Sequence, residues 1–307
     1  MKMTRKQVKN QTASIKARLA NIAKNKAREF DSVLLQYFQE RFLFRLSQSD
    51  YKGEFILKGA LLLMLKEDIR FRPTRDIDLL AQSLTANPEE IKNIFKTVAE
   101  IHSDDNVIFD PDSIAVAPIM AITEHGGILV KLTVRMGNMH KILSMDIGFG
   151  DSVYGGAKEL IFPTLLDSPS FKINCYSMES VIAEKFQALC WLNMQTSRMK
   201  DIFDIYFLAE KYKFKAAELY EAIKLTFTNR ETDLEFRKIV FSNAFKNSPL
   251  KQNQWESFLR RNHLNLICDF QNVISKIEVF LEPLFQNDYK KNIGSWDNEN
   301  WLWFKKS

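Results

Sequence analysis

The sequence predicts an α/β or α+β domain followed by a helical domain. Strand-like apolar runs alternate with helical segments between residues 50 and 175, and helical patterns dominate after that. Only 10 Gly and 8 Pro occur in 307 residues, which excludes a low-complexity chain and does not favour a many-turned β-sandwich. We expect basic helices over 1–49, a mixed domain over 50–175 and a helical bundle over 176–307.

The first half of the chain divides into short elements. Residues 4–48 contain no Gly or Pro and are expected to form two helices, the second capped by Asp31. Asn87 and Pro88 mark a helix start, as N-cap and first helical residue. The other expected elements are strands at 54–58, 76–80, 106–109, 114–122, 129–135 and 142–149, and helices at 60–65 and 87–101.

The second half reads as helices. Ser177 is a suitable N-cap for the first of them. The expected helices are 177–192, 198–211, 216–227, 232–244, 252–261 and 264–284. The tail carries Trp296, Trp301, Trp303 and Phe304, and we expect these aromatic side chains to dock onto their own domain.

The positive charge is concentrated at the N-terminus. Nine of the 43 Lys and Arg residues lie within residues 1–28, which contain no Asp or Glu, so 34 basic residues face 38 acidic residues in the rest of the chain. A basic segment of this kind can bind a polyanion, or it can be a solvated helix face. Both interpretations stay open from the sequence.

The cysteine spacing and the lengths of the apolar runs indicate the cellular compartment that the sequence fits. Cys175, Cys190 and Cys268 lie far apart, which excludes a zinc pattern and a disulfide framework and fits a reducing cytoplasm. No apolar run reaches about 18 residues, and the N-terminus lacks the apolar core of a signal peptide. We expect a cytoplasmic protein without a membrane partner.

A pair of acidic residues in an expected strand is the most informative motif. Asp76 and Asp78 stand at i and i+2, so their side chains share one face while Ile77 and Leu79 turn into the core. Adjacent carboxylates repel each other, and Mg²⁺ is the usual ion that holds such a pair together with substrate phosphates. The same spacing also fits surface residues on an edge strand.

A strand–glycine–helix unit lies upstream of this pair. Gly59 stands at the turn, where backbone N–H groups of the following helix can approach a phosphate. Lys58, Arg72 and Arg75 can add positive charge beside it. This unit favours a nucleotide site over the edge-strand interpretation.

A third acid strengthens the interpretation. Asp146 lies within an apolar strand-like run, where a carboxylate is costly to bury unless it is paired or holds a metal. If the two strands are neighbours, Asp76, Asp78 and Asp146 form a cluster suited to two-metal nucleotidyl transfer. Asp151 follows Gly150 and is expected to be a turn residue.

Charged residues also interrupt the apolar helices of the second half. Lys185 lies among apolar neighbours, where its stem can simply snorkel to solvent. Asp201 and Asp204 stand at i and i+3 on one helix face and can pair with Lys185 or Arg198. A structural ion pair and a functional site both fit this pattern.

Taken in order, these motifs resemble the AbiEii/AbiGii toxin family of nucleotidyltransferases over most of the first 210 residues. The resemblance is carried by residues 14–23, 40–46 and 55–60, by the Arg72-x-Thr74-x-Asp76-x-Asp78 motif, the Asp146 strand, Glu184-Lys185 and Lys200-Asp201-x-x-Asp204. It implies an α+β fold, with a polymerase-β-like nucleotidyltransferase domain containing a mixed sheet and joined to a helical bundle. It also implies Mg²⁺, with one or two ions, and a nucleoside triphosphate (NTP) as donor.

The resemblance also implies residue roles and partners. Asp76, Asp78 and Asp146 would be metal ligands and catalytic acids, Lys185 would contact phosphate, and Asp201 or Asp204 would complete the site. The nucleotide would be held by Lys58, Gly59, Ala60, Arg72, Thr74 and Arg75. Family members act as toxins beside an antitoxin, and some transfer nucleotides to tRNA. An RNA acceptor and an antitoxin are therefore the expected partners.

The chain departs from the family pattern at Ala60, where relatives carry Gly or nucleotidyltransferases carry Ser. Ala60 has no hydroxyl, so a phosphate contact there must come from its backbone N–H. Two alternatives to RNA transfer remain open: a catalytically silent protein that binds RNA or a partner, and a nucleotidyltransferase acting on a small-molecule or protein hydroxyl.

Overall fold

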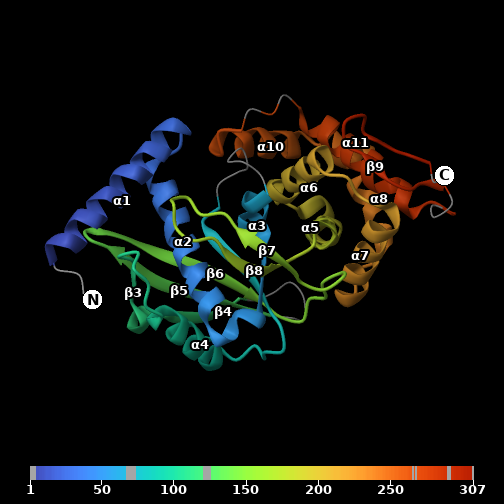
Figure 1. Ribbon diagram of the computed structural model, residues 1–307. Helices are drawn as coiled ribbons and strands as arrows, with labels where there is room; N and C mark the ends of the chain where they lie inside the picture. The colour runs from blue at the N-terminus through green and yellow to red at the C-terminus, as the bar shows by residue number, and fades with distance from the viewer. Residues whose placement is uncertain are drawn as a thin grey trace. The chain divides into compact units, whose positions relative to one another are not determined.

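The chain forms two compact units. The computed structural model describes residues 5–66, 74–119, 126–264, 266, 268–288 and 292–305 (Figure 1). The strand unit comprises Met1–Asp151 and Ala157–Tyr176, and the helical unit comprises Ser152–Gly156 and Ser177–Ser307. Across the described helices, none is both long and apolar enough to cross a membrane.

The strand unit begins with two packed helices, α1 (Arg5–Asn25) and α2 (Phe30–Gln48). Helix α2 follows Glu29, whose backbone is extended, so the expectation that Asp31 caps this helix is wrong. The Asp31 side chain lies in the first turn and forms an ion pair with Lys141 at 2.6 Å. A carboxylate in the first turn still suits the positive end of the helix dipole.

The unit is built around a mixed sheet whose strands run in the order β3-β5-β6-β2-β1-β8-β7, with β4 paired to β5. Strands β2 and β6 pair in parallel, as do β1 and β8, and the other pairs are antiparallel. The strands are β1 (Phe55–Lys58), β2 (Asp76–Ala81), β3 (Ile108–Phe109), β4 (Ala115–Ile119), β5 (Gly127–Met136), β6 (Met139–Gly148), β7 (Lys158–Phe162) and β8 (Phe171–Cys175). The sequence patterns did not predict β7 or β8.

One face of the sheet is covered by helices. The Phe95 ring of α4 (Pro88–Glu100) lies 5.6 Å from the Phe42 ring of α2 and 5.5 Å from the Phe55 ring of β1, measured between centroids. Ile77 and Leu79 on β2 are fully buried, and they share this face with Phe55 because of the register of β1 and β2. The side chains between them, Asp76 and Asp78, therefore point to the opposite face. The expected cap of α4 is confirmed, since the Asn87 side chain accepts hydrogen bonds from two backbone N–H groups of the first turn.

The helical unit contains α5 to α11. The expected Ser177 cap is confirmed, because the Ser177 hydroxyl accepts a hydrogen bond from the Ser180 N–H at the start of α5. The helices are α5 (Met178–Leu192), α6 (Met199–Lys211), α7 (Ala216–Asn229), α8 (Arg237–Val240), α9 (Asn243–Lys246), α10 (Pro249–Arg261) and α11 (Phe270–Leu281).

The expectation of one continuous helix over 232–244 is wrong. The Asp233 carboxylate accepts a hydrogen bond from Glu235 N–H, and the Ser242 hydroxyl accepts one from Phe245 N–H. These side chains start a short 3₁₀ turn and α9 in place of one helix, because capping competes with helix continuation. Likewise, the expected helix over 264–284 begins only at Phe270, where Asp269 is the N-cap.

The C-terminal tail docks onto the helical unit, as expected. It forms a small hairpin of β9 (Trp296–Asp297) and β10 (Leu302–Trp303). The indole N–H of Trp296 donates to the Ala209 carbonyl at 2.7 Å, and that of Trp303 donates to the Phe280 carbonyl at 2.9 Å. Trp296 is buried in the unit's core, and Trp301 and Trp303 pack against Tyr206 and Phe280, whereas Phe304 is exposed, so the expectation is wrong for Phe304.

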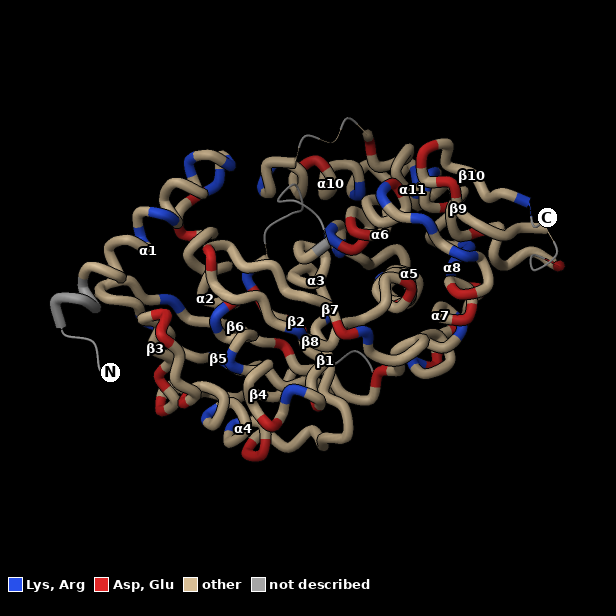
Figure 2. Tube along the Cα trace, in the orientation of Figure 1, with Lys and Arg blue, Asp and Glu red and all other residues tan. Residues whose placement is uncertain are grey.

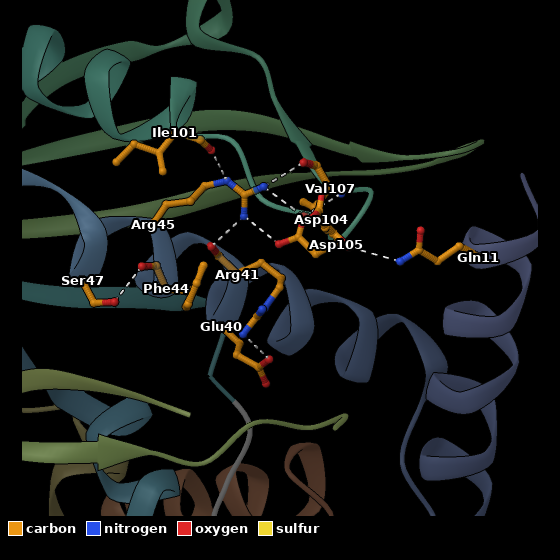
Figure 3. A network of polar contacts seen from close by, with 10 residues as sticks. All are labelled: Gln11, Glu40, Arg41, Phe44, Arg45, Ser47, Ile101, Asp104, Asp105 and Val107. Atoms are coloured by element: carbon orange, nitrogen blue, oxygen red, sulfur yellow. Dashed lines mark hydrogen bonds and ion pairs between the residues drawn. The ribbon is translucent and has the colours of Figure 1, made fainter. Parts of the chain in front are cut away.

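A buried polar network follows the polar side of α2 (Figure 3). Arg45 forms two hydrogen bonds with the Asp105 carboxylate, at 2.8 and 3.0 Å, and donates to the carbonyls of Ile101 and Val107. Arg45 and Asp105 are both buried. This pair ties α2 to the loop that follows α4, because a buried guanidinium needs its hydrogen bonds satisfied.

Glu40 is the second acid of this network and is almost fully buried. Its carboxylate accepts a hydrogen bond from the Leu165 N–H at 2.6 Å and lies 3.0 Å from an Arg41 nitrogen. Burial raises the pKa of Glu40 from 4.5 to about 7, although the Leu165 N–H and Arg41 lower it. Between pH 4.5 and about 7, Glu40 is therefore protonated in the folded protein, whereas in the unfolded chain it loses this proton.

We expect Glu40 to make stability fall as pH rises. Its contribution is fully present below pH 4.5 and is lost as the pH rises through about 7, and it amounts to about 3 kcal/mol. Urea unfolding between pH 4.5 and 8 should show that the free energy of unfolding falls with pH in wild type. In Glu40→Gln it should fall less steeply, even if the substitution also changes stability by a constant amount at every pH. Parallel pH profiles of the two proteins would contradict the assignment.

Candidate active site

Three acidic side chains share the face of the sheet opposite α2 and α4. Strands β2 and β6 are parallel neighbours, with Asp78 paired to Asp146 and Asp76 paired to Ser144. Because directly paired residues and alternate residues of one strand point to the same side, the three carboxylates lie on one face. The sequence analysis placed the three acids together only if their two strands were neighbours, and β2 and β6 are indeed paired.

The acids on this face have the chemistry to supply one or two ligands to a divalent cation. In the described part of the chain, no group of three or more His, Cys, Asp or Glu side chains converges to hold a metal. Asp78 and Asp146 nevertheless stand side by side across two strands, with Asp76 two residues before Asp78. Mg²⁺ commonly takes one or two protein carboxylates and completes its shell with water and phosphate oxygens.

Gly59 brings the start of α3 (Gly59–Lys66) against Asp78. Its φ is +68°, and a Cβ placed on it would lie 1.9 Å from an Asp78 carboxylate oxygen. A glycine is therefore required both by the backbone conformation and by the close approach. The neighbouring Ala60 side chain is buried and has no hydroxyl, so any hydrogen bond from this residue to a ligand would have to come from its backbone N–H. That arrangement suits a phosphate beside an acid-bound cation.

We expect Gly59→Ala to disable the site while the strand unit stays folded. The methyl group would push the Asp78 carboxylate out of place, and the left-handed backbone would add about 1–2 kcal/mol of strain. Nucleotide transfer should fall by about 100-fold or more. Gly53→Ala is the control, because a Cβ at Gly53 meets nothing within 4 Å. Similar activity in both variants would show that the contact does not matter.

The start of β2 is held from two sides. The buried Gln39 side chain of α2 donates to the Arg75 carbonyl at 3.1 Å, and the Thr74 hydroxyl donates to the Asp76 carbonyl at 3.2 Å. Thr74 thus makes a local contact, and the Arg75 side chain is exposed. Arg72 lies outside the described residues. The sequence patterns did not predict a role for Gln39, because its contact with Arg75 joins residues that lie 36 positions apart in the chain.

Lys58 also lies on the acid-bearing face, as the direct partner of Asp78 in the antiparallel β1–β2 pair. Its ammonium group pairs with Asp151 at 3.0 Å and lies 5.4 Å from the centre of the Tyr176 ring. Asp151 is therefore an ion-pair partner near the candidate site, and the sequence, which predicts only a turn there, gave no signal of this contact.

A second charged cluster lies in the helical unit. The Lys185 ammonium of α5 contacts Asp201 at 2.9 Å and Asp204 at 2.7 Å, both on α6, and Arg198 also pairs with Asp201. Asp201 and Asp204 are 1% and 0% exposed. Burial would raise the pKa of Asp201, but attraction to Lys185 and Arg198 outweighs burial, and the pKa lies well below its usual value. The ion pair is thus present, and its part in the reaction stays a proposal.

Comparison with known proteins gives a family match. Residues 41–275 match the family model described as nucleotidyl transferase AbiEii toxin, type IV TA system. Among solved structures, a candidate nucleotidyltransferase from H. pylori is 15% identical with a TM-score of 0.49, covering 83% of this chain and 95% of its own. JHP933 from Helicobacter pylori is 14% identical with a TM-score of 0.48, covering 83% of this chain and 92% of its own. A search of the curated proteins gave no match.

Proposed function

The chain belongs to the AbiEii family of nucleotidyltransferase toxins of type IV toxin–antitoxin systems, and from this premise we propose that it transfers a nucleoside monophosphate from an NTP to RNA, with tRNA as the acceptor class. The reaction is proposed to depend on Mg²⁺. The observation that supports this most directly is the pairing of Asp78 with Asp146 on parallel neighbouring strands. Asp76 shares their face, and Gly59 brings a helix start against Asp78.

Of Asp76, Asp78 and Asp146, one or two at a time would supply carboxylate ligands to the metal, and water and phosphate oxygens would complete its shell. Bound Mg²⁺ would neutralise charge on the triphosphate and on the reacting oxygens. Without a cation, the three carboxylates would repel a nucleoside triphosphate, which carries charge of the same sign. The acids of this chain would therefore define where the donor binds.

The donor phosphates would lie at the start of α3. The backbone N–H groups of Gly59 and Ala60 would donate to phosphate oxygens, and the helix dipole would add attraction. Lys58 and Arg75 would supply positive charge, together with Arg72, and Thr74 would hold the strand that carries Asp76. Lys185 would contact phosphate, with Asp201 or Asp204 orienting its ammonium group.

The transfer itself would be an in-line displacement. The oxygen of an RNA hydroxyl forms a bond to the α-phosphorus of the NTP, and the bond between that phosphorus and the α,β-bridging oxygen breaks. Pyrophosphate leaves, and the hydroxyl proton passes to the Asp146 carboxylate. Lys58 and the arginines would oppose the negative charge that develops on the leaving group.

The family description also supports a partner and a location. A type IV toxin is defined together with an antitoxin, and we propose that an antitoxin protein counteracts this enzyme. NTP and RNA are both cytoplasmic substrates, which supports a cytoplasmic location.

The test is to incubate the purified protein with total RNA, Mg²⁺ and each α-labelled NTP in turn. Label should enter discrete small RNAs and should disappear when EDTA removes the metal. Label in a protein or small molecule, with none in RNA, would replace the RNA acceptor by another hydroxyl. Absence of label in every acceptor, together with no Mg²⁺-dependent NTP binding by calorimetry, would indicate a catalytically silent binding protein.

A further inference from the structure

Helix α1 presents a strongly positive surface. We define the α1 surface as Lys16 and Lys24 of the helix together with Lys26, which directly follows its last residue; all three are exposed. Residues 1–28 carry nine Lys and Arg and no acidic residue, although acidic residues outnumber basic ones in the rest of the chain. Figure 2 marks the positions of Lys and Arg along α1 in blue. A local positive field of this kind favours a polyanion.

The α1 surface is held in place by the strand unit. Ile15, Leu19 and Ala23 are buried along one side of α1. The Gln11 side chain donates to the Asp104 carbonyl at 3.1 Å, and Arg18 pairs with Asp167 at 2.7 Å. The helix is therefore docked, and its lysines have a fixed spacing of about 12 Å between the Cα atoms of Lys16 and Lys24.

Within residues 10–25 of α1, the exposed positions other than Lys16, Arg18 and Lys24 indicate which polyanion fits. They are small or polar, with no large apolar or aromatic side chain among Asn10, Ala13, Ser14, Ala17, Ala20, Asn21 and Asn25. Protein interfaces rely on aromatic residues and are depleted in Lys. A helix that lies on a membrane needs a free apolar face, whereas Ile15, Leu19 and Ala23 of α1 are buried against its own unit. Phosphate backbones need only cations and small polar donors.

We propose that the α1 surface binds the phosphate backbone of the RNA acceptor. This inference rests on the proposed function and adds a binding site away from the three acids. Because no aromatic side chain is exposed on α1 for stacking on bases, the surface senses charge and not sequence. It raises the affinity for RNA and does not change the rate of the chemical step, which takes place at Asp76, Asp78 and Asp146.

The test compares two charge-matched triple variants of the full chain. Lys16→Gln/Lys24→Gln/Lys26→Gln removes the α1 surface, and Lys52→Gln/Lys92→Gln/Lys158→Gln removes three lysines from other elements of the same unit. Fluorescence anisotropy with labelled tRNA at several salt concentrations gives Kd. The α1 variant should bind about tenfold more weakly, and its slope of log K against log salt should be smaller by about 2. The control should stay within about twofold of wild type.

Kinetics separates this surface from the site itself. The α1 variant should raise KM for RNA about tenfold, as its Kd does, with kcat and Mg²⁺-dependent NTP binding unchanged. Equal RNA affinity in both variants, with RNA transfer intact in wild type, would overturn the α1 surface and leave the proposed function standing. A wild type that labels no RNA would overturn both. Binding to phosphatidylserine vesicles or to polyglutamate in place of RNA would overturn the inference.

Discussion

Asp78→Asn is expected to reduce nucleotide transfer by about a thousandfold or more, with the fold retained. Asn keeps the shape of the side chain but loses the charge that would hold Mg²⁺ beside Asp146. It also leaves the close contact with Gly59 in place. Initial rates of labelled NMP incorporation at saturating Mg²⁺ measure the effect, and the melting temperature monitors folding.

Asp112→Asn is the matched control for this substitution. Asp112 is an exposed acid in a short 3₁₀ turn of the same unit and lies on none of the strands that carry the candidate site. It should retain wild-type transfer within about twofold. If Asp78→Asn kept more than a tenth of the wild-type rate, the acid pair would not be the catalytic centre.

Lys185→Met is expected to destabilise the helical unit by about 3–5 kcal/mol. It removes the ammonium group that contacts both buried carboxylates, and Arg198 then remains as the partner of Asp201. Two buried negative charges would be left undercompensated. Urea unfolding measures the loss, and it should be accompanied by loss of transfer activity at temperatures where the unit unfolds.

The control for Lys185 is Lys200→Met, which removes an exposed lysine from α6. It should change the stability by less than about 0.5 kcal/mol. Burial would raise the pKa of Asp201, but attraction to Lys185 and Arg198 lowers it below its usual value. The ionised Asp201 therefore stabilises the folded protein above a pH of about 4, and this contribution is lost as the pH falls further. A Lys185→Met protein as stable as wild type would contradict the structural role of this ion pair.

The sequence predicted best what depends on near neighbours. The alternation around Asp76 and Asp78 predicts one polar and one buried face, and the structure shows both. The caps Asn87 and Ser177 were predicted because an N-cap bonds within three residues of itself. Asp146 was found in the same way, as a carboxylate within an apolar strand-like run, and the structure pairs it with Asp78.

Contacts over long sequence distances were beyond the reach of these patterns. Strand β8 (Phe171–Cys175) has only five residues and pairs in parallel with β1, more than a hundred residues earlier. The partners of Lys58 and Arg75 were missed for the same reason. Such contacts are set by topology, and residue type and spacing carry little information about them.

The chain passes between its two units more than once. Residues 152–156 belong to the helical unit, although strand-unit segments flank them on both sides. There the Tyr154 N–H donates to the Ser180 hydroxyl at 2.9 Å, and the Ser152 hydroxyl donates to the Asn229 side chain at 3.3 Å. A single genetic crossover at any point therefore cannot exchange one unit and leave the other whole. A crossover after Tyr176 would leave residues 152–156 from one parent packed against α5 and α7 from the other, so the contacts of Tyr154 with Ser180 and of Ser152 with Asn229 would have to match between the parents.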